Sequence, residues 1–445
     1  MKKRLVFFCL FSVLALSSFA QSKFVIQNKK QSDKIDFKLI HNLMVVPVQV
    51  NGVALSFILD TGVSKPIIFN FLNGADTLKV KNTETLFLRG LGDGEPVEAL
   101  KSSNNIFKIG EAININQHLY AIFGLDINFA PRLGIPIHGI IGLDLFKDFI
   151  VEINYRAKYI RLHEPNVYKY KTCKKCERFN LEFYNDKPYI NAHVNIQNKK
   201  IPVKLLIDSG GSDSLWLFED DAIGIQSGNA FFRDFLGHGL SGSVYGKRTK
   251  VDTFYLKNFK LKHANVAYPD ATSIAFAKRV KERNGSIAGN ILKRFNVIVD
   301  YKNSLLTLKK NANFKDEFRY NNSGIELAHS GVRFVKEYDN TTFKPNENRG
   351  LSKASDGVNV VLDRTYRMAL KPAYAIVELR ENSPAKKAGL QKGDVILTIN
   401  GKTTHQLKLQ QIMHMFYGNI GKLIKLKVER GNTVLSFNFR LEKPY

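Results

Sequence analysis

The sequence contains an internal repeat with a period of roughly 147 residues, and no other feature restricts its possible folds as strongly. Four short motifs occur twice, in the same order and at nearly the same offset. They are Asp60-Thr61-Gly62 and Asp208-Ser209-Gly210, Gly90–Gly92 and Gly237–Gly239, Gly139–Gly142 and Gly285–Gly289, and Asn154-Tyr155 and Asp300-Tyr301. A single coincidence of this kind arises by chance, whereas four in register indicate one structural unit that is written twice.

Each copy of the repeat has the residue pattern of β-strands joined by tight turns. In the first copy, apolar residues alternate before the turn signal Asn51-Gly52, and a second apolar run ends at Asp60. The second copy has the same order, with an apolar run that ends at Asp208. Each copy closes with a further pair of predicted strands: 149–153 with 159–162, and 296–299 with 305–308. Both aspartates are therefore expected just after a buried strand, in a loop that contains glycine.

The pattern changes after about residue 311 to that of a compact α+β module. A motif with Ser383-Pro384-Ala385 and Gly393-Asp394 leads into Ile399-Asn400-Gly401. A helix is predicted at 409–416, and alternating strands follow at 423–429 and 434–441. The whole chain is therefore predicted to be mainly β, with two β lobes and an α+β domain. The predicted domains are residues 36–165, 179–311 and 320–445, the last with a polar insertion at about 339–357.

The first twenty residues have the features of a signal peptide. Basic residues precede an uncharged run that ends at Ser18-Phe19-Ala20, which is typical of a cleavage site. We therefore expect residues 1–20 to be removed and the mature protein to be exported to the periplasm or the extracellular space. A short membrane anchor is the alternative interpretation.

The charge and the cysteines restrict the partners and cofactors. The formal net charge of +26 favours anionic surroundings such as an envelope surface, with a solvated basic surface as the alternative. Basic residues are not interleaved with aromatic ones as a nucleic-acid surface requires, so no nucleic acid is expected. Cys173 and Cys176, in the linker between the two repeats, are too few for a zinc site and are candidates for a local disulfide. No metal and no cofactor is expected.

The paired Asp loops suggest acid–base chemistry. If the two halves meet about a pseudo-twofold axis, Asp60 and Asp208 come close together, and the pair keeps one proton because two adjacent carboxylates do not both ionise. The ionised carboxylate can then take a proton from a bound water while the protonated one hydrogen-bonds a carbonyl oxygen. The alternative is that both aspartates are ordinary turn residues that cap strands.

The residues that follow each aspartate fit the same interpretation. The hydroxyls of Thr61 and Ser209 can hydrogen-bond across to the opposite loop and brace it. Gly62 and Gly210 allow tight turns and a close approach of two backbones.

A glycine-rich segment lies about 30 residues after each aspartate, within β-type sequence, and is predicted to form a flap hairpin that closes over a bound peptide. The flap glycines are Gly90, Gly92, Gly94, Gly237, Gly239 and Gly242. Plain surface turns are the alternative.

These residues resemble the aspartic peptidases of the retropepsin/pepsin clan, and most of all the exported bacterial retropepsin-like members that carry a C-terminal PDZ domain. The resemblance spans about residues 38–310 for the peptidase and 320–445 for the PDZ domain. It implies that Asp60 and Asp208 are catalytic, that the protein hydrolyses peptide bonds, and that both halves carry a flap. Since both halves lie on one chain, a monomer is expected to be active.

Two positions differ from the pepsin pattern, in which Ser or Thr often follows the glycine. Here Val63 and Gly211 stand there, so the ionised carboxylates receive fewer hydrogen bonds and their pKa values should be higher. We therefore expect a pH optimum in mild rather than strong acid.

The resemblance also implies that the PDZ domain binds an extended peptide, with a loop at Gly324, Ile325 and Leu327 near the peptide terminus. A PDZ domain that only supports its neighbour is the alternative. For the whole chain, the alternative to an aspartic endopeptidase is a catalytically inactive protein that binds peptides or scaffolds an envelope complex.

Overall fold

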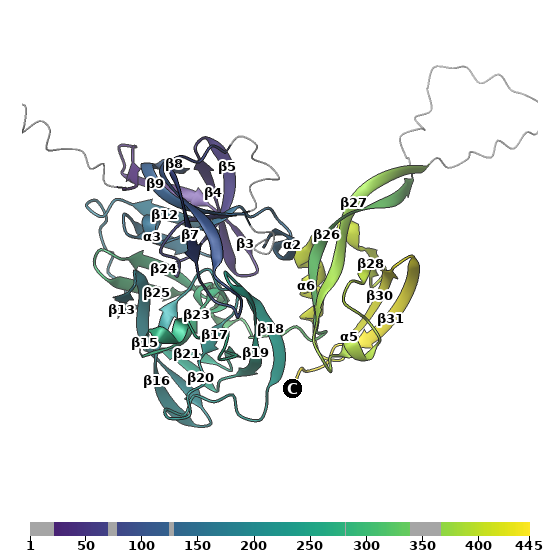
Figure 1. Ribbon diagram of the computed structural model, residues 1–445. Coiled ribbons are helices and arrows are strands. Elements are labelled where there is room, and N and C mark those ends of the chain that lie inside the picture. Colours follow the sequence, from purple (N-terminus) through teal and green to yellow (C-terminus); the bar gives the residue numbers. More distant parts are fainter. Residues whose placement is uncertain (1–21, 70–77, 124–128, 281, 339–365) are drawn as a thin grey trace, which may run out of the picture. The chain divides into compact units, whose positions relative to one another are not determined.

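The computed structural model describes residues 22–69, 78–123, 129–280, 282–338 and 366–445 (Figure 1). These residues are mainly β and form two compact units. The first unit runs to Tyr320 and includes Pro444–Tyr445, and the second is Asn321–Lys443. The expected signal peptide and the expected polar insertion at 339–357 lie outside the described residues.

In the first half of the first unit, the described residues form a nine-stranded sheet with two short helices. Apolar residues alternate along β4, and Asn51 and Gly52 both have positive φ, which gives the tight turn into β5. Its elements are β1 (Val25–Ile26), β3 (Lys38–Ile40), β4 (Leu43–Val50), β5 (Val53–Leu59), β6 (Ile67–Phe69), β7 (Thr83–Leu88), β8 (Val97–Ile109), β9 (Ala112–Ile122), α2 (Ala130–Leu133), β10 (Gly139–Ile141) and α3 (Leu143–Phe146).

The second half repeats this arrangement in a sheet for which ten strands are described. In the first half β10 runs parallel to β5 and antiparallel to β6, and in the second half β23 runs parallel to β16 and antiparallel to β17. Its elements are β14 (Glu182–Tyr184), β15 (Lys187–Ile196), β16 (Lys199–Ile207), β17 (Leu215–Leu217), β18 (Phe232–Gly239), β19 (Gly242–Lys250), β20 (Thr253–Leu256), β21 (Phe259–Lys262), β22 (Asn265–Pro269), η2 (Ala277–Arg279), β23 (Arg283–Ile287) and α4 (Gly289–Leu292).

A six-stranded sheet joins the two halves, in the order β13-β25-β24-β11-β12-β2. The predicted strand pairs at the end of each repeat are present here as β11 with β12 and β24 with β25. At the centre Glu152 faces Ile298, and these two residues occupy equivalent positions in the repeat. A local twofold axis therefore passes between them. The strands are β2 (Ser32–Asp36), β11 (Ile150–Asn154), β12 (Tyr159–His163), β13 (Cys176–Asn180), β24 (Phe295–Asp300) and β25 (Leu305–Lys310); η3 (Ala312–Lys315) follows.

One apolar core runs through both halves and fixes them as a single body. It includes Phe57 and Leu59 from the first half, Leu205 and Ile207 from the second, and Val151 from the joining sheet, all buried. Burial of apolar side chains from both halves in one cluster stabilises their association in the same way as it stabilises each half.

The second unit is an α+β domain with its own core, built from strands β26–β31 and helix α6. The predicted helix at 409–416 is present as α6. Ser383 caps α5 through its hydroxyl, which accepts a hydrogen bond from the Lys386 amide. The elements are β26 (Ile325–Tyr338), β27 (Tyr366–Leu379), α5 (Pro384–Lys387), β28 (Val395–Ile399), β29 (Lys402–Thr403), η5 (Thr404–Gln406), α6 (Leu409–Phe416), β30 (Leu423–Arg430) and β31 (Thr433–Arg440). Among the helices of the described ranges, none has the length and apolar character needed to cross a membrane.

Candidate active site

Each of the two aspartates stands directly after a buried strand within its sheet. Asp60 follows β5 and Asp208 follows β16. Each aspartate amide donates a hydrogen bond to the neighbouring parallel strand: Asp60 N to Ile141 O at 2.8 Å, and Asp208 N to Ile287 O at 2.9 Å. These matched bonds hold both loops in the same position on equivalent strands.

Four reciprocal hydrogen bonds tie the two Asp loops to each other. The Thr61 amide donates to Ser209 Oγ at 3.0 Å, and the Ser209 amide donates to Thr61 Oγ1 at 3.0 Å. Each hydroxyl donates in turn to the carbonyl before the opposite aspartate: Thr61 Oγ1 to Ile207 O at 2.7 Å, and Ser209 Oγ to Leu59 O at 2.8 Å. Because both side chains are buried and their polar groups are partnered, this network holds the loops rigidly.

The glycines that follow bring the two carboxylates to the same place. A Cβ atom added at Gly62 would lie 3.2 Å from Asp60 Oδ1 and 3.6 Å from Asp208 Oδ1, so one point is within contact distance of both carboxylates. A Cβ atom at Gly210 would lie 2.2 Å from Asp60 Oδ2, which is closer than two atoms can approach. A larger residue at position 210 would therefore displace the Asp60 carboxylate.

The pKa values of both aspartates are raised. Burial, followed by the nearby charge of Asp208, raises the pKa of Asp60 to about 7, although the Gly62 amide donates to its Oδ1 at 2.6 Å and favours the charged form. Burial also raises the pKa of Asp208, opposed first by the charge of Arg283 and then by that of Lys187. The two carboxylates are therefore coupled and can share one proton in mild acid.

A tyrosine supports the first Asp loop from behind. The Tyr301 hydroxyl donates to Thr61 O at 3.2 Å, and its ring stacks on Phe146 with the centroids 5.5 Å apart. Tyr155 is the equivalent residue of the first half. Its hydroxyl is buried and has no hydrogen-bond partner within the described part of the chain. The repeated aromatic residue thus packs in both halves but hydrogen-bonds to a loop in only one.

The predicted flap segments form the ends of two hairpins, β7–β8 and β18–β19, and their tips interlock. The Gly94 amide donates to Ser241 O at 2.7 Å, and the Ser241 amide donates to Leu91 O at 2.9 Å. The glycines are required by this contact, since a Cβ atom at Gly239 would lie 2.1 Å from Leu91 O and one at Gly90 would lie 2.6 Å from Leu240 Cβ.

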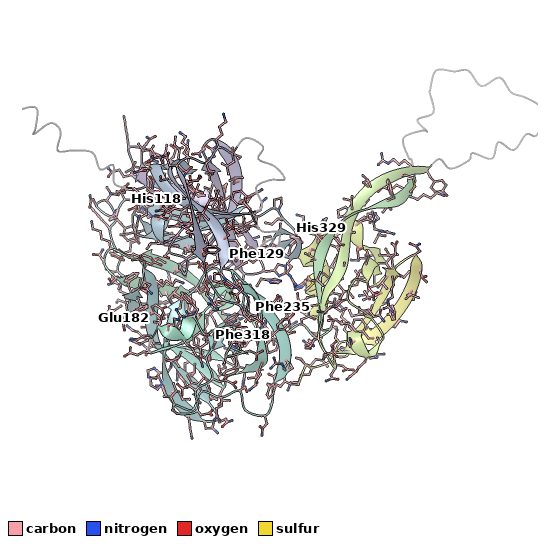
Figure 2. All side chains as sticks on the ribbon, viewed as in Figure 1. His118, Phe129, Glu182, Phe235, Phe318 and His329 are labelled. Carbon is pink, nitrogen blue, oxygen red and sulfur yellow. A yellow bond between two sulfur atoms is a disulfide. The ribbon has the colours of Figure 1, made fainter. Side chains whose placement is uncertain are left out.

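The flaps also contact the opposite half through side chains. Leu240, at the tip of the second flap, packs against an apolar cluster of the first half that contains Ile58 and Ile137. The Arg132 guanidinium of α2 lies 4.4 Å from the ring centroid of Phe235 on β18, which Figure 2 labels. Leu91 of the first flap packs in turn against Phe218, Ile274 and Ala277 of the second half, so each flap is anchored on the half that it does not belong to.

Two cationic side chains near the aspartates were not identified from the sequence. Lys187 begins β15 and Arg283 begins β23, both in the second half. Burial lowers the pKa of Lys187, and the charges of Asp60 and Asp208 oppose this shift. Burial also lowers the pKa of Arg283, and the charge of Asp208 opposes part of that shift. Neither residue belongs to a repeated motif, but a comparison of equivalent positions in the two copies would have shown that apolar residues of the first copy become basic in the second.

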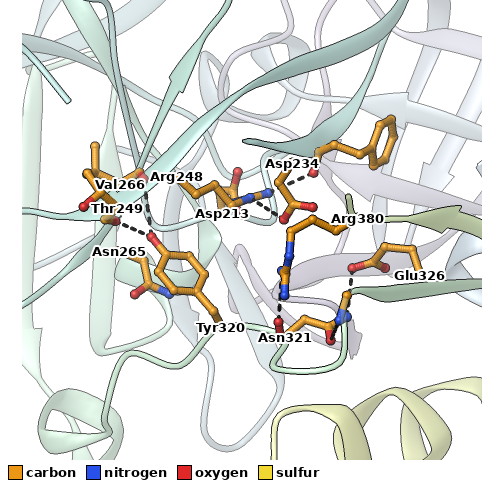
Figure 3. A network of polar contacts seen from close by, with 12 residues as sticks. Asp213, Asp234, Arg248, Thr249, Asn265, Val266, Tyr320, Asn321, Glu326 and Arg380 are labelled. Carbon is orange, nitrogen blue, oxygen red and sulfur yellow. Dashed lines mark hydrogen bonds and ion pairs between the residues drawn. The ribbon is translucent and has the colours of Figure 1, made fainter. Parts of the chain in front are cut away.

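A buried arginine supports the loop after Asp208 (Figure 3). Arg248 Nη1 donates to Asp213 Oδ1 at 2.6 Å, and its Nε lies 3.1 Å from Asp234 Oδ2. Asp213 also accepts a hydrogen bond from the Trp216 indole at 2.7 Å. Burial lowers the pKa of Arg248, but the charges of Asp213 and Asp234 outweigh burial and raise it, so this side chain stays charged. The network links β19 of the flap to the Asp208 loop.

The remaining predicted pair in the first unit, Cys173 and Cys176, forms a disulfide with the Cα atoms 5.5 Å apart. Cys176 is the first residue of β13, so the disulfide closes the linker where it enters the joining sheet. Within the ranges that the structure describes, no group of three or more His, Cys, Asp or Glu side chains is arranged to hold a metal ion.

The expected binding loop of the C-terminal domain leads directly into β26, which begins at Ile325. The side chains of Ile325 and Leu327 are 0% and 2% exposed and belong to the domain core. The amide of Gly324 donates to Asn321 Oδ1 at 3.1 Å, and that of Ile325 donates to Ser323 Oγ at 3.0 Å. These contacts fix the shape of the loop, and its role at a peptide terminus stays a prediction.

The edge strand that begins at this loop can accept a peptide. In the described part of the domain, β26 stands at one end of the strand order and pairs with β27 alone, and α6 packs beside it. An edge strand of this kind can add an extended peptide as a further strand.

Comparison with known protein families places a PDZ domain at residues 376–430. This match covers α5, β28, α6 and β30. No curated protein matches the chain. The match therefore suggests peptide binding by the C-terminal domain. It does not extend to the two repeated halves, whose function has to be inferred from their own geometry.

Proposed function

We propose that this protein is an aspartic endopeptidase of the retropepsin/pepsin type, with a C-terminal PDZ domain that binds peptides. The observation that carries the proposal is the convergence of two carboxylates, Asp60 and Asp208, from equivalent loops that brace each other through Thr61 and Ser209. Two ordinary turn residues would need neither the reciprocal hydrogen bonds nor the close approach at Gly210.

The charges around the two aspartates favour different catalytic roles for them. The charges of Arg283 and Lys187 favour the ionised form of Asp208, so Asp208 is assigned as the base that takes a proton from the attacking water. Asp60, with its raised pKa, is assigned as the acid that donates a hydrogen bond to the scissile carbonyl. Attack of the water on the carbonyl carbon gives a tetrahedral intermediate, which collapses with protonation of the leaving nitrogen.

The flaps would exclude bulk water from this reaction. An extended substrate would lie between the Asp loops and the interlocked tips, so the hydrogen bonds between Ser241 and the first flap must open before it enters. The pepsin-like expectation of a monomer remains part of the proposal, because one chain supplies both aspartates and both flaps.

The compartment and partners follow from the sequence. Residues 1–20 would direct export, so the substrates would be exported or envelope proteins, and the net charge of +26 would favour an anionic surface. The PDZ domain would recruit a substrate segment along the edge of β26.

The experiment compares the full mature chain with Asp60→Asn and Asp208→Asn on an unfolded protein substrate from pH 3 to pH 8. Asp36→Asn is the matched control, since Asp36 is an exposed residue of β2 whose side chain is 80% accessible. Cleavage by the wild type and the control, but by neither dyad variant, supports the proposal. Equal cleavage by all four proteins excludes it. A statine-type inhibitor, which mimics the tetrahedral intermediate, should bind the wild type and block cleavage.

Absence of cleavage in every protein at every pH would favour the inactive peptide-binding alternative. Binding of an extended peptide to the wild type, measured by fluorescence anisotropy, would then identify the protein as a peptide-binding module.

A further inference from the structure

In each half, one face of the sheet lies under the flaps. The side chains at equivalent positions of these two faces differ in chemistry. In the first half this face is apolar and forms one cluster with Leu240 of the opposite flap. We call it the first-half face; its residues are Leu43, Val45, Ile58, Ile67, Ile137 and Ile140. The equivalent second-half face consists of Lys187, Tyr189, Leu206, Trp216, Arg283 and Ser286.

The strand register establishes these equivalences. Leu43 and Lys187 each follow a two-residue turn with positive φ, at residues 41–42 and 185–186. Val45 faces Ile58, two residues before the first aspartate, and Tyr189 faces Leu206, two residues before the second.

The remaining equivalences follow from the strand that runs parallel to the aspartate-bearing strand in each half. Gly139 pairs with Phe57, and Gly285 pairs with Leu205, each three residues before its aspartate. Two residues before these glycines stand Ile137, which is fully buried, and Arg283, which is partly exposed. A buried isoleucine in one copy is thus a partly exposed arginine in the other.

The second-half face lies beside the aspartates. A Cβ atom at Gly62 would lie 3.6 Å from Leu206 Cδ2 as well as from Asp208 Oδ1, so this face reaches the Asp loops. Tyr189, whose side chain is on the same side of β15 as that of Lys187, is paired with Leu206. The charges of both aspartates act on Lys187, and that of Asp208 acts on Arg283.

Two polar groups of this face are left without a conventional partner. Within the described ranges, Lys187 Nζ has no hydrogen bond and no ion pair, although the side chain is only partly exposed. The Tyr189 hydroxyl is buried and makes no hydrogen bond of standard geometry there, although the Arg283 guanidinium lies close enough to interact with it. Arg283 donates to Gly285 O and Ser286 Oγ and its guanidinium lies 5.2 Å from the Phe218 ring centroid, so it is held in place by its own half.

A partly buried ammonium with no hydrogen bond and no close ion pair leaves its donors unsatisfied, and an anionic ligand can complete it. We propose that Lys187 and Arg283 select an acidic side chain of the substrate on the side of the scissile bond that faces the second half. The first-half face, which Leu240 of the opposite flap covers in this structure, receives an apolar side chain once that flap has opened. This inference rests on the proposed peptidase function and names its substrate class: an extended polypeptide with an acidic residue on one side of the cleaved bond and an apolar residue on the other.

The test measures kcat/KM for quenched-fluorescence peptides that differ only in Glu, its neutral isostere Gln, or Leu next to the scissile bond. The wild type should cleave the Glu peptide roughly 10- to 100-fold faster than the Gln peptide, the range expected for a hydrogen bond to a charged partner in a desolvated site. Lys187→Met should remove most of this preference, Lys187→Arg should restore it, and Lys187→Glu should shift it towards Lys. Lys199→Met, at an exposed residue of the same half, is the matched control.

Arg283→Ile, which introduces the residue found at the equivalent first-half position, should reduce the preference further in combination with Lys187→Met. Circular dichroism and urea midpoints establish that each variant is folded. Equal kcat/KM for the Glu and Gln peptides in the wild type, or an unchanged preference in folded Lys187→Met, overturns the inference while the peptidase proposal stands.

If no peptide is cleaved, the proposed function fails and the inference is decided by binding. Anisotropy of labelled Glu and Gln peptides on the wild type then measures the same selectivity. If the wild type binds the Glu peptide more tightly and Lys187→Met loses this difference, the cationic site still determines binding. Equal binding of both peptides by the wild type overturns the inference.

Discussion

The two halves of the first unit are alike where they hold the aspartates and different where they face the flaps. Thr61 and Ser209 make the same two hydrogen bonds in opposite directions, with lengths that agree within 0.1 Å. Leu43 and Lys187 occupy equivalent turns, but one is in an apolar cluster and the other is a cation without an ion pair among the described residues.

The difference shows which positions the chemistry restricts. The bracing network works only if each half supplies a hydroxyl and a glycine at the same place, since the two loops contact each other across a local twofold axis. In the proposed peptidase the faces beneath the flaps would contact the substrate, which is itself asymmetric. In a homodimer the two faces would be identical by symmetry, whereas a single chain that carries both halves can change one face alone.

The largest expected effect tests whether the two aspartates are equivalent in catalysis. Asp60→Asn and Asp208→Asn should each reduce kcat by roughly a thousandfold or more, because acid and base act as one unit and removal of either disables both roles. The measurement is steady-state hydrolysis of a quenched-fluorescence peptide. A tenfold or smaller loss in one variant would mean that the two carboxylates do not share the reaction.

The hydroxyls of Thr61 and Ser209 should contribute equally to the free energy of unfolding. Thr61→Val and Ser209→Ala each remove two buried hydrogen bonds and leave an amide of the opposite loop without an acceptor. Each should therefore lower the free energy of unfolding by about 2–4 kcal/mol. Urea unfolding measures this, with Thr85→Val, at an exposed position on β7, as the control. A loss in one variant only would show that a single loop carries the interface.

The flap tips allow a similar comparison. Gly90→Ala and Gly239→Ala place a methyl group against Leu240 and Leu91 of the opposite tip, so both should lower kcat/KM roughly tenfold by misplacing the closed flaps. Gly237→Ala is the control, because a Cβ atom there has no neighbour within 4 Å, although its φ of 148° is unfavourable for alanine. A loss as large in Gly237→Ala would attribute the effect to backbone strain and not to the contact between tips.

The smallest effect concerns the pH dependence of stability. The folded pKa of Asp60 is raised from 3.8 to about 7, so the folded state binds more protons than the unfolded state between these pH values, and stability falls as the pH rises through this window. Asp60→Asn removes this cost and should stabilise the protein at pH 8 but hardly at pH 4.

Asp208→Asn should stabilise less than Asp60→Asn at pH 8, because Arg283 and Lys187 already offset part of the cost of the Asp208 charge. Thermal unfolding of both variants at pH 4 and pH 8 measures this difference. Equal gains at pH 8 would show that the cations of the second half do not act on Asp208 in the folded protein.

Much of the first unit was predictable, because its determinants are local. The apolar run before each aspartate, the turn at Asn51-Gly52 and the closing strand pairs all appear where the sequence places them. The helix at 409–416 and the local Cys173–Cys176 pairing are of the same kind. Repetition strengthened the signals of the two halves, since the apolar run before the aspartate and the closing strand pair each occur twice.

The conformation of the C-terminal loop depends on contacts that its local sequence does not reveal. Gly324, Ile325 and Leu327 were assigned to ligand binding from their place in a motif. The Asn321 side chain folds back onto the loop and accepts the Ser323 and Gly324 amides, and the apolar side chains pack into the domain core. The match at 376–430 begins after this loop, so it supports peptide binding by the domain without assigning it to these residues.

The sequence alone determined that two similar β units follow each other, that each ends a buried strand in an Asp-Thr/Ser-Gly loop, and that an α+β domain follows. Hydrophobic periodicity, turn residues and repetition are properties of neighbours along the chain, so they can be read without coordinates. Only the tertiary structure decided that the loops brace each other, that the flap tips interlock, and that Lys187 and Arg283 lie beside the aspartates. These contacts join residues more than twenty positions apart, and in most cases more than a hundred. Their existence depends on how two sheets pack together, which no local pattern specifies.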